Sequence, residues 1–113
     1  MPSTRRTFSR QTRDAARFLG HQIAQARRER RWTLDDLAAR AGVTPFTVRK
    51  VERGDPTVAL GTAFEIAWLL GVPLFGSTEP GSLAGALRRS EDRLALLPTR
   101  VRPAPSKVPS GDF

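Results

Sequence analysis

The sequence predicts an all-α protein of five helices, with a basic arm before them and a disordered tail after them. Three observations support this prediction. Apolar residues recur at spacings of three and four from residue 14 to residue 75, and no stretch alternates apolar and polar residues as a half-buried strand would. The segments between the helical patterns are short, and capping residues, glycines and prolines mark their ends.

Length and composition narrow the class of protein. The chain has 113 residues, 19 Lys and Arg against 11 Asp and Glu, and no cysteine. This length holds one domain with a modest core. Without cysteine there is no disulfide framework or thiolate zinc site. The one histidine, His21, is expected to lie on a helix surface without a chemical role. We expect no cofactor, no metal and no enzymatic activity.

No segment has the pattern of a membrane span or a secretory signal. The longest apolar run, residues 66–75, contains Gly71 and Pro73 and falls short of the ~20 residues that span a bilayer. No apolar segment follows the basic N-terminus, as a secretory signal would require. The composition therefore favours a soluble, cytoplasmic protein with no membrane partner.

The positive charge lies at the two ends of the chain. Residues 1–32 carry a net charge of +7, residues 33–80 of −2, and residues 81–113 of +3. Residues 1–13 are polar and rich in arginine, which is typical of a flexible DNA-binding arm. The alternative interpretation is an organelle transit peptide, which is also rich in Arg and Ser and poor in acidic residues.

Cap residues delimit the first three predicted helices. The first runs from Asp14, its expected cap, to about residue 30, and its apolar stripe is Ala15, Leu19, Ile23 and Ala26. The second, residues 33–41, begins at Thr33 with Asp36 completing a variant capping box, and ends at Gly42. The third, residues 44–53, begins at Thr44 with Pro45 in its first turn, and ends at Gly54.

Two more helices follow, the second of them beyond a break. The fourth runs from about residue 61 to 70 and ends at Gly71 and Pro73. After a Gly/Ser/Pro-rich break comes a fifth amphipathic pattern at residues 82–97, which Pro98 ends. We therefore expect a domain at 14–76, a linker and C-terminal helix at 77–97, and a disordered, proline-rich tail at 98–113.

The second and third helices, joined by about three residues around Gly42, have helix-turn-helix spacing. Three sequence motifs cover this pair and the helix after it. They are L-x-x-L-A-x-x-A-G-V at 34–43, T-P-F-T-V-R-K-V-E-R-G at 44–54 and A-F-E-I-A-W-L-L-G-V at 63–72. In these motifs residues 19–75 resemble the Cro/phage-repressor (Xre-type) helix-turn-helix family. The resemblance implies double-stranded DNA as a partner.

The third helix divides into a basic side and an apolar side. At 100° per residue, Phe46, Arg49, Lys50 and Arg53 share one side, and Val48, Val51 and Glu52 lie on the other. Arg and Lys side chains reach guanine edges and phosphates in the major groove. A merely solvated basic face is the alternative interpretation. The full set of expected DNA-binding residues is Thr33, Thr44, Pro45, Phe46, Thr47, Arg49, Lys50 and Arg53.

The resemblance places base readers at Pro45, Phe46, Arg49 and Lys50, but Pro45 and Phe46 differ from the amide side chains often seen there. Phe46 either presses on a thymine methyl group or packs back against its own helix. Where the family frequently has a phosphate-binding glutamine, this chain has Leu34, so Thr33 and the first amides of its helix are expected to take that contact.

The resemblance also implies a structural ion pair between Arg27 and Glu52. A separate prediction concerns the fourth helix, in which Phe64 and Trp68 form a second apolar stripe. A domain of this size buries two stripes with difficulty. Either the 82–97 helix or a second copy of the chain covers this stripe, and we expect a homodimer with the 82–97 helix contributing.

The sequence is compatible with three functions. The first is a dimeric repressor at a promoter palindrome. The second adds an antitoxin role, because a short helix-turn-helix protein with one extra helix and a Pro/Arg-rich tail resembles antitoxins that repress their own operon and neutralise HipA-like kinase toxins. The third is a coactivator-type or RNA-directed adaptor, in which the basic face need not read bases.

Overall fold

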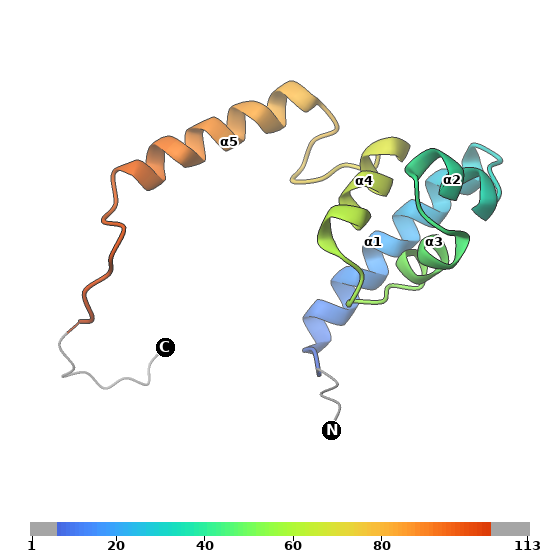
Figure 1. The fold of residues 1–113 in the computed structure, drawn as a ribbon, viewed down its shortest axis with the longest axis horizontal. Helices are drawn as coiled ribbons and strands as arrows, with labels where there is room; N and C mark the ends of the chain where they lie inside the picture. Colours follow the sequence, from blue (N-terminus) through green and yellow to red (C-terminus); the bar gives the residue numbers. More distant parts are fainter. Residues whose placement is uncertain (1–6, 105–113) are drawn as a thin grey trace. The chain divides into compact units, whose positions relative to one another are not determined.

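The computed structural model describes residues 7–104, and the chain divides after Thr78 into two compact units. The first unit holds four helices and the second holds one (Figure 1). Residues 1–6 of the predicted arm and residues 105–113 of the predicted tail lie outside the described residues. Within residues 7–104, no helix is both long enough and apolar enough to cross a membrane.

Helix α1, Arg10–Glu29, begins earlier than predicted, because its cap is Ser9 and not Asp14. Ser9 is the cap, and its hydroxyl accepts a hydrogen bond from the backbone N–H of Thr12 at 3.2 Å. Asp14 lies one turn inside the helix, 3.8 Å from the guanidinium of Arg10. The last part of the expected flexible arm is therefore helical, because a serine cap and an i,i+4 ion pair are available there.

The next two helices confirm the predicted helix-turn-helix. Helix α2 is Leu34–Ala41 and helix α3 is Pro45–Glu52, each capped by the expected threonine. Gly42 has a φ of 73°, a left-handed conformation that glycine adopts without the steric cost of a Cβ. The turn is closed by a hydrogen bond from the N–H of Val43 to the carbonyl of Ala38 at 3.0 Å.

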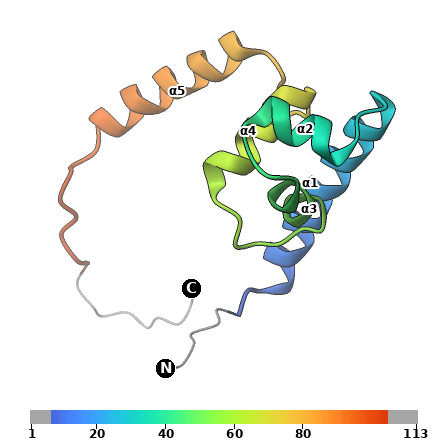
Figure 2. The same ribbon diagram turned by 45° about the vertical axis from the view of Figure 1, so that its right-hand side comes forward.

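Helix α4, Leu60–Leu70, completes the first unit. Helix α1 packs against α3 and α4, and α2 packs against the same two helices (Figures 1 and 2). Ala15, predicted on the buried stripe of α1, is instead exposed. The single core joins all four helices and consists of Ile23, Leu37, Ala38, Val48, Val51, Ile66, Ala67, Leu70 and Val72.

Two glycines permit close approaches between α1 and α3. A Cβ at Gly20 would lie 2.5 Å from the carbonyl oxygen of Val51 and 2.6 Å from that of Glu52. Gly54, with a φ of 80°, lies against the backbone of Arg17, where a Cβ would meet its Cα at 2.6 Å. The backbones of α1 and α3 therefore meet directly, without side chains between them.

The second unit contains helix α5, Pro80–Ala95, which begins and ends two residues earlier than predicted. Pro80 occupies its first turn, a position where the missing N–H costs nothing. No residue of α5 is buried, and Leu87 and Leu94 are 57% and 67% exposed. Residues 98–104 of the predicted tail form no helix or strand.

Candidate nucleic-acid interface

The N-terminus of α3 is open and electrically uncompensated. The hydroxyl of Thr44 accepts a hydrogen bond from the N–H of Thr47 and donates one to the Thr47 hydroxyl, both at 3.1 Å. The first turn of α3 contains no acidic residue, whereas that of α2 contains Asp35 and Asp36. The partial positive charge at the start of α3 therefore remains available to an anion.

The outward side of α3 carries the expected basic residues. Arg49 and Arg53 are exposed, and Val48 and Val51 are buried behind them. Phe46 is 60% exposed, so its ring does not pack back into the core. The ring instead lies 5.7 Å from the ammonium group of Lys50, within the range of a cation–π contact.

Lys50 is held by an acidic neighbour. Its ammonium nitrogen lies 3.8 Å from a carboxylate oxygen of Asp55. The same carboxylate accepts hydrogen bonds from the side chain and backbone N–H of Thr57, at 2.6 and 2.8 Å. These bonds, with weaker attraction from Lys50 and Arg53, lower the pKa of Asp55 below its ordinary value. To contact a base edge, Lys50 would therefore have to give up its ion pair with Asp55.

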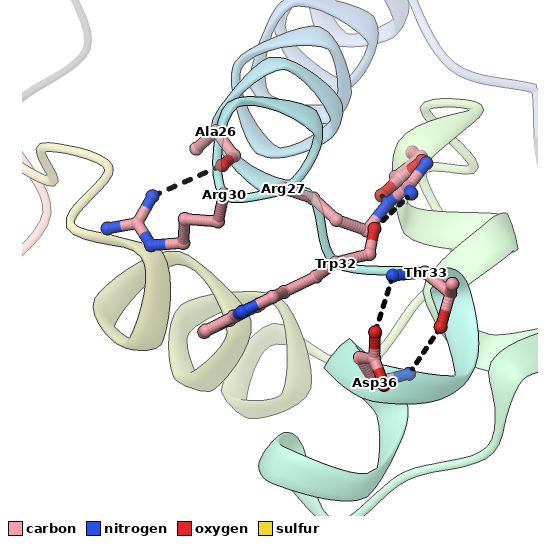
Figure 3. A network of polar contacts seen from close by, with 7 residues as sticks. Ala26, Arg27, Arg30, Trp32, Thr33 and Asp36 are labelled. Carbon is pink, nitrogen blue, oxygen red and sulfur yellow. Dashed lines mark hydrogen bonds and ion pairs between the residues drawn. The ribbon is translucent and has the colours of Figure 1, made fainter.

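Thr33 is committed to the start of α2. Its hydroxyl accepts from the N–H of Asp36 at 3.0 Å, and its own N–H donates to the Asp36 carboxylate at 2.8 Å (Figure 3). These hydrogen bonds lower the pKa of Asp36. The backbone N–H of Thr33 is thus used by the capping box, and the Thr33 hydroxyl proton is what it can still offer to a phosphate.

The ion pair between Arg27 and Glu52 is present and nearly buried. Two guanidinium nitrogens of Arg27 donate to the Glu52 carboxylate at 2.7 and 3.0 Å, and the two side chains are 11% and 10% exposed. A third donor group of Arg27 reaches the carbonyl of Trp32 at 2.8 Å (Figure 3). The hydrogen bonds from Arg27 to Glu52 raise the Arg27 pKa despite partial burial. The pair fixes the end of α3 to α1.

The stripe on α4 is only partly covered within the first unit. Phe64 and Trp68 are both half-buried. The Phe64 ring meets the ring of Phe75 edge to face, with centroids 5.9 Å apart. Phe75 is 77% exposed and has a φ of 55°, next to Gly76 at 79°, in a turn closed by Leu74 and Ser77. Leu60, 68% exposed, lies at the start of the same helix.

Two arrangements were not foreseen from the sequence. The indole of Trp32 has the guanidinium of Arg40 at 4.2 Å and that of Arg30 at 5.6 Å. Arg28 of α1 lines a groove together with Arg49 and Arg53 of α3. The α1 periodicity contains the signal for the second arrangement, because residues 17, 21, 24 and 28 share one helical side.

Comparison with known proteins agrees with this geometry. A helix-turn-helix family model matches residues 23–76. The chain is 30% identical over 88 residues to the HTH-type transcriptional regulator SutR of Escherichia coli strain K12. That alignment covers 78% of this chain and 49% of SutR, so the chain spans about half the length of this relative. No solved structure matches the chain.

The fold and the matched segment define a helix-turn-helix domain. Its helix-turn-helix pair consists of α2 and α3, and α3 is the second helix of that pair. Through this domain, the chain belongs to the Cro/phage-repressor (Xre-type) helix-turn-helix family.

Proposed function

We propose that the chain is a transcriptional regulator, in its simplest form a repressor, that binds double-stranded DNA sequence-specifically through α3. The observation that carries this proposal is the two-sided character of α3. Arg49 and Arg53 face outward, while Val48, Val51 and the Arg27–Glu52 ion pair hold the helix from behind. A rigidly held helix with a basic outer side suits the major groove.

The residues divide by the kind of contact that their position favours. Pro45, Phe46, Arg49 and Lys50 are the proposed base readers, and the exposed ring of Phe46 suits the methyl group of thymine. Phosphate contacts come from the start of α3 and from a second set of side chains, which carry most of the affinity but little sequence information. This second set is Thr33, Thr44, Thr47 and Arg53.

A second copy of the chain is the proposed partner at α4. The patch formed by Leu60, Phe64 and Phe75 is exposed or half-exposed, and Trp68 lies on the same helix. An isologous contact through this patch would cover it in both copies. Two α3 helices about 34 Å apart would then reach successive major grooves on one side of the duplex.

An antitoxin role extends this proposal. The exposed leucines of α5, Leu87 and Leu94, offer an apolar surface that a protein partner would cover, and the tail follows directly. In this role the protein represses its own operon and neutralises a HipA-like kinase toxin. Co-expression tests it: deletion of residues 98–113 is expected to abolish neutralisation, and a chain that still neutralises without them would exclude the tail as the binding segment.

Selection of bound duplexes from a randomised library tests the DNA proposal. We expect enriched palindromes, bound 10³-fold or more tightly than scrambled duplex of equal length. Lys50→Ala is expected to reduce that ratio by roughly 10-fold or more, the worth of one base contact. Arg89→Gln on α5 is the matched control for loss of one positive charge. Equal affinity for selected and scrambled duplexes would exclude sequence-specific regulation and favour the adaptor alternative.

A further inference from the structure

A cationic groove runs between α1 and α3, with a volume of about 820 Å³. Four arginines and two glutamates line it, together with His21 and apolar atoms of Ala24 and Leu34. Arg49 of α3 and Arg53, the residue that follows the end of α3, stand on one side. Arg28 of α1 stands on the other. The groove therefore has one wall on α3 and one wall on a helix outside the helix-turn-helix pair.

The acidic residues of the groove neutralise its basic residues only in part, because four arginines line it against two glutamates. Glu52 is bound by Arg27, 2.7 Å away. Glu29 accepts a hydrogen bond from the side chain of Gln25 at 3.1 Å. Within residues 7–104, none of Arg28, Arg49 and Arg53 forms an ion pair or a side-chain hydrogen bond, and Arg53 interacts with Asp55 only at longer range.

Several other basic side chains of the first unit have partners. Arg10 pairs with Asp14, and Lys50 pairs with Asp55. Arg30 and Arg40 lie against the ring of Trp32. Arg28, Arg49 and Arg53 line the same groove, and none of these three arginines forms an ion pair with a described carboxylate. Like charges in this arrangement repel, and an anion between them relieves the repulsion.

We infer that this groove seats the phosphodiester backbone of one DNA strand, with Arg28 as a phosphate contact from α1. The inference rests on the proposed function. A helix with its side chains is about 10–12 Å across and the major groove is about 12 Å wide. A strand backbone must therefore run along each flank of a docked α3, and the flank that carries Arg49 is the one that borders Arg28.

Salt dependence of binding tests the inference on the full chain. The probes are the duplex selected above and a scrambled duplex of equal length. Arg28→Gln is expected to reduce the slope of log affinity against log salt by about 0.9 on both duplexes. The ratio between the two affinities should stay unchanged, because phosphates carry no sequence information. Arg31→Gln removes the same charge from an exposed position that does not line the groove.

The possible outcomes separate the two proposals. A wild-type chain that binds neither duplex overturns both. A wild-type chain that binds DNA, with an unchanged slope in Arg28→Gln or an equal loss in Arg31→Gln, overturns the groove contact alone. Poly-glutamate is the probe for the competing occupant, an acidic protein segment: if Arg28→Gln weakens binding of poly-glutamate but not of DNA, the groove is a protein site. Circular dichroism is the folding control, and we expect both variants to keep the wild-type helix content.

Discussion

Helices α3 and α5 show that length does not decide how firmly a helix is fixed. α3 has 8 residues and α5 has 16. α3 has a threonine cap, two buried valines and the Arg27–Glu52 ion pair at its end, whereas α5 has no side-chain cap hydrogen bond and no buried residue. An isolated helix of either length is marginal in water. Tertiary contacts, not helix length, therefore make α3 a fixed element.

The same difference fits the two functions proposed for these helices. A helix that reads DNA must be oriented before it binds, and α3 is oriented by α1 and α2. In the proposed antitoxin role, α5, whose Leu87 and Leu94 are exposed, would gain its apolar contacts from a protein partner. Three substitutions test this comparison.

Breaking the ion pair that fixes α3 is expected to have the largest effect. Glu52→Ala leaves Arg27 nearly buried without its carboxylate, which costs about 3–5 kcal/mol of unfolding free energy. Urea unfolding followed by tryptophan fluorescence measures the loss. The double variant Arg27→Met/Glu52→Leu removes both charges, and we expect it to recover most of that stability. A loss below about 1 kcal/mol in Glu52→Ala would show that packing alone holds α3.

Adding one methyl group between α1 and α3 is expected to have the next largest effect. In Gly20→Ala the new Cβ meets backbone oxygens of Val51 and Glu52, which cannot move unless α3 moves. We expect a loss of about 1–3 kcal/mol in the same unfolding experiment. An unchanged unfolding midpoint would contradict the close approach of the two helices.

The same substitution in α5 should act in the opposite direction. A Cβ at Gly85 would meet only the far end of the Arg89 side chain, at 3.3 Å. Gly85→Ala therefore gains the roughly 1 kcal/mol of helix propensity that alanine offers over glycine, confined to α5. Far-UV circular dichroism should show a small rise in helix content while the melting of the first unit stays unchanged. A lower melting temperature would reveal contacts of α5 that its exposed residues do not suggest.

Local signals in the sequence were sufficient for the helix-turn-helix. The capping box of Thr33 and Asp36, the left-handed Gly42 and the cap at Thr44 each depend on residues within four positions of one another. The basic side of α3 follows from helical periodicity alone. The family resemblance supplied the Arg27–Glu52 pair, which links residues 25 positions apart.

Other features depend on competing caps or on long-range packing. Ser9 and Asp14 are both good cap residues, and the earlier one begins α1. Gly20 has no pattern that distinguishes a helix contact from a tolerated glycine, because the atoms that it meets belong to α3. The groove beside Arg28 likewise exists only once α1 and α3 are placed together.

The direct backbone contact at Gly20 also bears on the thermodynamics of binding. The helices that form the two walls of the groove are in direct backbone contact at Gly20, with no side chain between them. The distance between the backbone positions of Arg28 and Arg49 is therefore fixed before any ligand binds. Ordering upon association is then confined to the guanidinium-bearing side chains, at about 0.5–1.5 kcal/mol of lost rotamer entropy for each one immobilised. If the groove binds a DNA strand as proposed, this rigid scaffold would fix the spacing of the phosphate groups that fit into it.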